Sequence, residues 1–193
     1  MDKFQNKYRI PSARLQHWDY GWAGSYFITI CTKDRIHYFG EIENSKMVLS
    51  NVGVLADVFW HEIKTHSQNV ELGEFVVMPN HIHGVLILTG NDDNHNVNGN
   101  IYGNVETGHA LPLQQTEKTI GQQRFQNIGK NSVSSIVGSY KSAVAKHAHR
   151  LGYEFEWQTR FHDHVIRDDE SFQKISNYII NNPMNWQEDK FYN

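Results

Sequence analysis

Apolar residues along the chain follow two periods, one typical of strands and one typical of helices. Runs of aromatic and β-branched residues bounded by turn residues predict strands. These runs cover residues 25–32, 39–42, 47–49, 72–78 and 82–88. The turn at 43–46 predicts a small hairpin, and the breaker Pro79-Asn80 predicts that the last two runs are neighbouring strands of one sheet.

Helical periodicity marks two further segments. Apolar residues recur every three or four positions over 52–63, which predicts an amphipathic helix with Ser50 or Asn51 as its N-cap. The same spacing recurs over 132–150 and predicts a second helix that ends near Gly152. Each helix would turn one apolar face toward a core.

The C-terminal part predicts one more strand and one more helix. A strand-like stretch covers 155–166, and Asp168 can cap a helix that Pro183 ends. The apolar stripe of this helix consists of Phe172, Ile175 and Ile179. The order of elements therefore predicts an α+β fold, compatible with an antiparallel sheet that carries helices on one side.

The segment 90–131 differs from its surroundings. It is rich in Asn and Gly and has almost no apolar pattern, so it cannot build a core and is expected to be a long, partly mobile insertion. The length of 193 residues suits one domain with one core. We therefore expect a single domain over 1–193 that carries this insertion.

Composition narrows the class of protein. Hydrophobic residues make up 39% and aromatic residues 12% of the chain, which excludes a wholly disordered protein. Cys31 is the only cysteine, so neither an intramolecular disulfide nor a cysteine-based zinc site can form. No stretch approaches the roughly 18 apolar residues of a membrane span. These features lead us to expect a soluble cytoplasmic protein that does not bind membranes.

Although the net charge of the chain is −3, one region has an excess of basic residues. Between Lys118 and Arg167 there are eight Lys and Arg residues against three Asp and Glu residues. Such a local excess is compatible with a solvated helix face or with a surface that binds nucleic-acid phosphates. The candidate nucleic-acid ligands are Lys130, Lys141, Lys146, Arg150, Arg160 and Arg167.

A pair of histidines is the sharpest local motif. Side chains alternate along a strand, so His81 and His83 would project from one face while Ile82 points into a core on the other. Two imidazoles on one face can bind a metal ion, although such a pair can also be structural. A metal would need a third ligand from a different element.

The last predicted helix offers such a ligand. Tyr178 and Asn182 are four residues apart, so they lie on one face of that helix, at the border of its apolar stripe. The helix could deliver a nucleophile and an amide-oxygen ligand together. The alternative is an ordinary boundary tyrosine, with Asn182 capping the helix before Pro183.

These motifs together resemble a known family. The segment FVVMPNHIHGVLIL, from Phe75 to Leu88, is similar to the strand of single-tyrosine HUH transposases that carries two histidines around a large hydrophobic residue. The tail EWQTRFHDHVIRDDESFQKISNYIINNP, from Glu156 to Pro183, resembles the C-terminal signature of REP-associated tyrosine transposases. GSYFITICTKDR and IVGSYKSAV extend the resemblance over most of the chain except its Asn-rich part.

The resemblance implies a fold and a chemistry. It implies a ferredoxin-like or RRM-like antiparallel sheet with the HUH motif on a central strand and the nucleophile helix across it. Carried over, Tyr178 is the nucleophile, and His81, His83 and Asn182 hold Mg²⁺ or Mn²⁺. The implied activity is cleavage and rejoining of single-stranded, hairpin-forming DNA through a 5′-phosphotyrosine, by a monomer or a homodimer.

Competing interpretations remain at this level. Tyr140 lies on an apolar stripe, which favours a core position, and is the reserve nucleophile. Asp168, Asp169 and Glu170 are better suited to a helix N-terminus than to an acidic catalytic triad. A noncatalytic single-strand-binding module, or an HUH nickase of the replication or conjugation type, is the alternative function; the small size of the chain disfavours the nickase.

Overall fold

The computed structural model describes residues 3–4, 7–8, 20–89 and 132–192. The predicted insertion over 90–131 and the candidate ligand Lys130 lie outside the described residues. Three short segments flank the main elements: β1 (Lys3–Phe4) pairs with β2 (Lys7–Tyr8), and η1 (Lys33–Arg35) is a single 3-10 turn. A second such turn, η3 (Trp186–Glu188), lies near the C-terminus.

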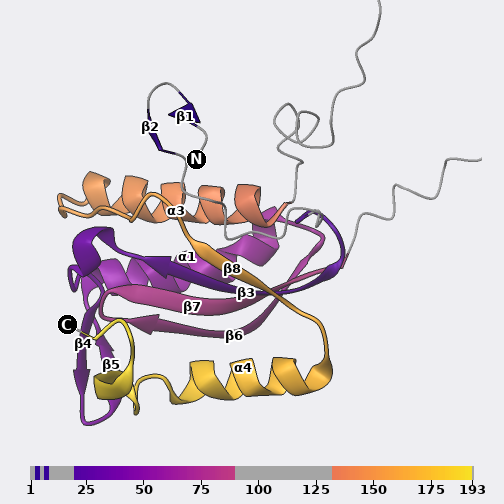
Figure 1. The fold of residues 1–193 in the computed structure, drawn as a ribbon. Helices are drawn as coiled ribbons and strands as arrows, with labels where there is room; N and C mark the ends of the chain where they lie inside the picture. Colours follow the sequence, from indigo (N-terminus) through magenta and orange to yellow (C-terminus); the bar gives the residue numbers. More distant parts are fainter. Residues whose placement is uncertain (1–2, 5–6, 9–19, 90–131, 193) are drawn as a thin grey trace, which may run out of the picture.

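A four-stranded antiparallel sheet forms the centre of the fold (Figure 1). Its strands in spatial order are β6 (Val70–Met78), β7 (His81–Leu88), β3 (Gly24–Cys31) and β8 (His162–Ile166). The hairpin of β4 (Gly40–Glu43) and β5 (Lys46–Leu49) forms separately, as predicted. The histidine pair therefore lies on a central strand.

The strand predicted over 155–166 is shorter than expected. Only its C-terminal half joins the sheet as β8, and Trp157 pairs with Thr32 through an isolated bridge. Phe155 is fully buried in the main core beside Phe39, which draws the first half of the segment off the sheet. Burial of aromatic surface thus prevails over strand propensity here.

Helices cover both faces of the sheet, whereas the sequence indicated only one (Figure 1). α1 (Asn51–His66) and α3 (Val133–Arg150) share one face, which gives the order β3-α1-β6-β7-α3-β8 of a ferredoxin-like fold. α4 (Asp169–Asn181) lies on the other face. The reason is that this face is also apolar: Val85 and Ile166 pack with the α4 stripe.

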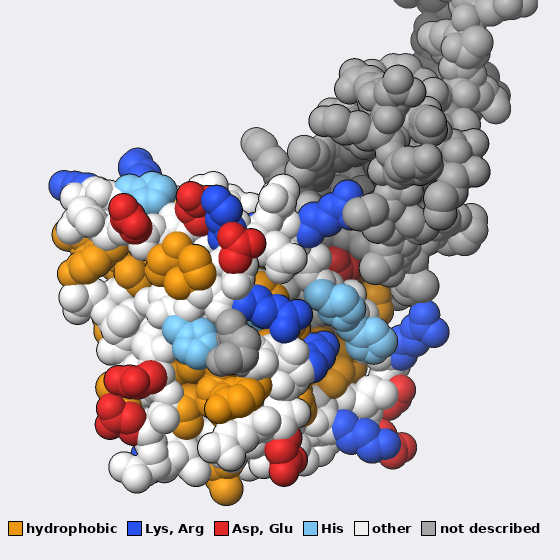
Figure 2. Space-filling view, turned by 60° about the vertical axis from the view of Figure 1, so that its left-hand side comes forward, with side chains coloured by type: hydrophobic (Ala, Val, Ile, Leu, Met, Phe, Trp, Pro, Cys, Tyr) orange, Lys and Arg blue, Asp and Glu red, His pale blue; other side chains and the backbone are white. Residues whose placement is uncertain are grey.

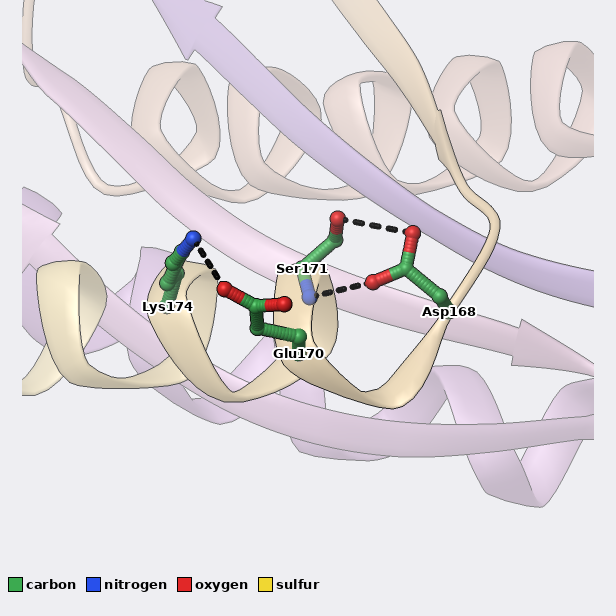
Figure 3. Close-up of polar contacts among 4 residues, drawn as sticks. All are labelled: Asp168, Glu170, Ser171 and Lys174. Atoms are coloured by element: carbon green, nitrogen blue, oxygen red, sulfur yellow. Dashed lines mark hydrogen bonds and ion pairs between the residues drawn. The ribbon is translucent and has the colours of Figure 1, made fainter.

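Local sequence signals define where the helices begin. Ser50 caps α1 and Ser132 caps α3, each through a hydroxyl that accepts a backbone N–H. At α4, the carboxylate of Asp168 accepts the backbone N–H and the hydroxyl of Ser171, at 2.7 and 3.0 Å (Figure 3). These bonds to Ser171 lower the pKa of Asp168. Asp168 is thus a helix cap, as predicted.

None of the helices among the described residues is long and apolar enough to cross a membrane.

Gly84 has no side chain and so leaves room for a tryptophan ring at the centre of the sheet. The indole of Trp60, from α1, is fully buried and stacks on Phe75 with ring centroids 4.5 Å apart. A β-carbon at Gly84 would overlap this indole. The residue after the histidine motif is therefore small because an aromatic ring occupies the space above it.

Gly84→Ala is expected to lower the free energy of unfolding by about 1–3 kcal/mol, since overpacking forces Trp60 or the strand to move. Chemical denaturation of both proteins would measure the change. Gly138→Ala is the matched control, because a β-carbon there, on the exposed face of α3, meets no atom within 4 Å. The control should be neutral or more stable by up to about 1 kcal/mol; equal stability of Gly84→Ala would contradict the packing explanation.

Candidate functional site

The two histidines of β7 meet on the α4 side of the sheet. His81 and His83 are 0% and 1% exposed, and their Nε2 atoms lie 3.1 Å apart. Ile82, between them, is buried in the main core on the other face. The alternation predicted from the sequence is therefore present, and it directs two ring nitrogens to one point.

Neighbouring groups orient both rings. The amide nitrogen of Asn80 donates to the carbonyl of Phe191 at 2.9 Å, so its oxygen faces His81 Nδ1 at 2.8 Å. Because an amide oxygen only accepts, Nδ1 of His81 donates and its Nε2 carries a lone pair. Thr29 Oγ1 lies 2.9 Å from Nδ1 of His83 and fixes the orientation of that ring. Partners of this kind commonly orient metal-binding histidines.

Burial keeps both imidazoles neutral. It lowers the pKa of His81 to about 3, with smaller contributions from Lys190 and Arg35. Burial, followed by the neighbouring His81, lowers the pKa of His83 well below its usual value. Neutral imidazole is the form that binds metal ions, and the two Nε2 atoms, 3.1 Å apart, converge on a point where a cation could bind both rings.

Tyr178 extends from α4 to the same point. Its hydroxyl lies 3.2 Å from Nε2 of His83 and donates to Oδ2 of Asp189 at 3.0 Å. The side chain is 41% exposed, and its ring meets Phe27 edge-on with centroids 6.2 Å apart. Partial burial, and then the charge of Asp189, raise the pKa of Tyr178, so the phenol is protonated. A group that accepts its hydrogen bond is already in place.

Two side chains with oxygen atoms that could bind a metal complete the cluster. Asn182 is 2% exposed, and its amide nitrogen donates to Oδ2 of Asp189 at 2.9 Å. Its amide oxygen is buried without a hydrogen-bond partner in the protein, and native proteins rarely leave such an atom without a water or ion bound to it. Asp189, His81 and His83 offer ligand atoms that all lie within 4.8 Å of one another. This donor set of imidazoles, an amide and a carboxylate fits a divalent cation.

Aromatic rings of the C-terminal segment cover the histidines. The ring of Phe191 lies 4.5 Å from that of His81 and 5.8 Å from that of His83, and the ring of Trp186 lies 5.9 Å from that of His81. Trp186 and Phe191 are themselves nearly buried. They exclude water from one side of the cluster, which strengthens electrostatic interactions inside it.

Sequence reasoning missed Asp189. It lies seven residues after Asn182, beyond the end of α4, and reaches the site only because the chain turns back through η3. No helical or strand spacing connects it to the other ligands. An acidic residue shortly after the tyrosine helix was the only available signal.

The other candidate residues are distributed over the molecule. Tyr140 is 3% exposed, its hydroxyl donates to the carbonyl of Ala56, and burial raises its pKa far above the usual value. It is a core residue, as the apolar stripe indicated.

The described basic candidates lie on α3 and beside β8. Lys141, Lys146 and Arg150 lie on α3, on the sheet face opposite α4, and the ammonium of Lys141 donates to two backbone carbonyls, of Gln158 and Thr159. Arg160 and Arg167 instead flank the edge strand β8 and are exposed. Lys141 thus contacts the segment that leads into Arg160.

Comparison with known proteins identifies a relative of the chain and a solved structure of similar fold. No family model matches it. A protein of Haemophilus influenzae described as uncharacterised is 34% identical over 182 residues, which are 94% of this chain and 92% of that protein. A solved structure of a REP-associated tyrosine transposase bound to a REP hairpin matches with a TM-score of 0.52 and 18% identity, over 93% of this chain and 77% of that one. The chain therefore belongs to one family with the Haemophilus influenzae protein, and it has the fold of a REP-associated tyrosine transposase, which confirms the architecture that its motifs implied.

Proposed function

We propose that this protein is a metal-dependent DNA strand transferase that cleaves and rejoins single-stranded DNA through Tyr178. One observation carries the proposal: the Tyr178 hydroxyl lies within hydrogen-bond distance of both His83 and Asp189, and these two residues form a cluster of possible metal ligands with His81. A nucleophile beside a candidate metal site is the arrangement that phosphoryl transfer needs.

The chemistry assigns one role to each side chain. The Tyr178 oxygen attacks the scissile phosphorus, a Tyr–O–P bond forms, and the bond from phosphorus to the 3′-oxygen breaks. The leaving 3′-oxygen takes up a proton and becomes a hydroxyl. Asp189 accepts the hydrogen bond of the phenol, orients its oxygen, and takes the phenolic proton as the Tyr–O–P bond forms. The phosphotyrosine retains the energy of the broken ester, so rejoining needs no nucleotide cofactor.

A divalent ion, Mg²⁺ or Mn²⁺, would be held by His81, His83 and Asn182, with Asp189 beside them. The unpartnered amide oxygen of Asn182 and the two converging ring nitrogens support this ligand set. Such an ion, when bound, supplies charge stabilisation for an in-line displacement at phosphorus. A phenol with a raised pKa is a poor nucleophile without that help.

Hairpin-forming single-stranded DNA is the proposed substrate. The REP hairpin bound to the transposase of the same fold supports this choice. The test incubates the protein with labelled single-stranded hairpin oligonucleotides, with and without Mg²⁺ or Mn²⁺, and separates the products under denaturing conditions. We expect a covalent protein–DNA species that depends on metal. Metal-independent binding without any covalent species would favour a noncatalytic single-strand-binding module instead.

A further inference from the structure

Two exposed cations lie together above the histidines although 155 residues separate them in the chain. Arg35 donates from Nη1 to the backbone carbonyl of Lys190 at 3.0 Å. The guanidinium carbon of Arg35 lies 5.0 Å from the centroid of the Phe191 ring, and the Lys190 ammonium lies 4.8 Å from it. Since that ring covers His81, the positive charges are held at the edge of the tyrosine site.

The backbone that presents Arg35 has an unusual conformation. Asp34 and Arg35 have φ values of 52° and 56°, in the left-handed region that residues other than glycine rarely adopt. No residue of η1 is buried, so core packing does not account for this conformation. Sparsely populated backbone conformations at an exposed loop often serve the placement of a functional side chain. Here they place a guanidinium against the C-terminal segment.

The positive charges of Arg35 and Lys190 lie close enough to act on the histidine–tyrosine cluster. Both cations lie against the Phe191 ring, whose centroid is 4.5 Å from that of His81, so both charges are close to the imidazole. Figure 2 shows Lys and Arg side chains near the middle of one face of the molecule, next to His side chains, and most Asp and Glu side chains nearer its rim. An anion approaching Tyr178 from this side therefore meets positive potential.

A groove continues from Arg35 away from the histidines. Its volume is about 640 Å³, and it runs between η1 and the segment before β8. The residues lining it are Thr32, Lys33, Asp34, Arg35, Glu156, Trp157, Gln158 and Thr159. Lys33 forms an exposed ion pair with Glu156, at 2.6 Å, and exposed pairs of this kind contribute little and can open for a competing anion.

We propose that Arg35 and Lys190 bind the backbone phosphate of the nucleotide next to the cleaved bond, and that the groove beside Arg35 carries the strand onward. A planar guanidinium and a mobile ammonium are the side chains best suited to phosphate oxygens. The two are positioning residues, because they hold the strand and take no part in bond making. This inference rests on the proposed function of the tyrosine site.

The test measures how salt weakens binding of a single-stranded hairpin oligonucleotide. Each phosphate contact to a single strand contributes about −0.7 to the slope of log K against log salt. Since both side chains contact one phosphate, Arg35→Gln and Lys190→Gln should each reduce the magnitude of the slope by at most about 0.7. The double variant should lose the full contribution of about 0.7 and bind roughly fourfold more weakly near 0.15 M salt. Lys64→Gln, which changes an exposed lysine of α1, is the matched control and should leave the slope unchanged.

A second arm identifies the anion. Oligonucleotides with an uncharged methylphosphonate at successive linkages are bound by the wild type and by the double variant Arg35→Gln, Lys190→Gln. At one linkage the methylphosphonate should weaken binding by the wild type but not by the double variant, because the double variant has already lost both contacts to that phosphate. Inorganic phosphate at the millimolar level should not displace the DNA; displacement in the wild type alone would assign the two cations to free phosphate and overturn the proposal.

The outcomes separate this proposal from the proposed function. Unchanged slopes in both variants, with covalent adduct formed by the wild type, would overturn the phosphate contact and leave the transferase intact. Reduced slopes without any covalent adduct in the wild type would support the contact and contradict the transferase. Thermal unfolding of each variant should match that of the wild type, since both side chains are exposed.

Discussion

Tyr178→Phe should abolish the covalent protein–DNA adduct while leaving noncovalent DNA binding nearly unchanged. The substitution removes the oxygen that we propose as the nucleophile and keeps the ring that packs against Phe27 and His83. Loss of the hydrogen bond to Asp189 should lower the free energy of unfolding by about 1 kcal/mol at most. Denaturing gel electrophoresis after incubation with labelled DNA and metal measures the adduct.

Tyr140→Phe provides the matched control for this prediction. It removes one hydroxyl from a core tyrosine on the opposite face of the sheet, and leaves the carbonyl of Ala56 without that donor. We expect a destabilisation of about 1–3 kcal/mol and normal adduct formation. Adduct formed by Tyr178→Phe but not by Tyr140→Phe would transfer the nucleophile to Tyr140.

His83→Ala should weaken the binding of Mn²⁺ by more than the roughly 10–100-fold that changes in supporting residues usually produce. His83 lies between His81 and Tyr178, so its loss removes one ring nitrogen and the contact to the phenol. Isothermal titration of the purified protein with Mn²⁺ measures the affinity without DNA. Adduct formation should fall in parallel.

His164→Ala is the matched control for metal binding. His164 is exposed on β8, opposite Phe27 in the register, and is not among the clustered ligand atoms. Its substitution should leave the Mn²⁺ affinity unchanged. Equal affinities of His83→Ala and the wild type would reject the metal site.

The same titration with Mn²⁺ distinguishes Asn182 from Asp189 as the third metal ligand. We expect Asn182→Ala to weaken Mn²⁺ binding roughly 10–100-fold, because its buried amide oxygen has no hydrogen-bond partner in the protein. Asp189→Asn should affect adduct formation more than metal affinity, since Oδ2 of Asp189 already accepts bonds from Tyr178 and Asn182. The opposite order would make Asp189 the third ligand.

The sequence by itself determined the features that depend on local periodicity. Alternation along β7 brought His81 and His83 to one face, and this holds for any strand whatever lies around it. Helical spacing placed Tyr178 and Asn182 on one side of α4, and the cap at Asp168 marked where that helix begins. Each of these relations spans only a few residues, so propensity and spacing suffice.

Only the tertiary structure decided which distant groups meet. The side of the sheet that α4 covers depended on both faces being apolar, a property no single strand discloses. Asp189 enters the site through the turn after α4, and Arg35 meets Lys190 across 155 residues. Such contacts are set by the packing of Phe191 and Trp186 over the histidines. Periodicity predicts which side chains share a face of one helix or strand. Chain reversal and the burial of aromatic surface decide which helices and strands come together.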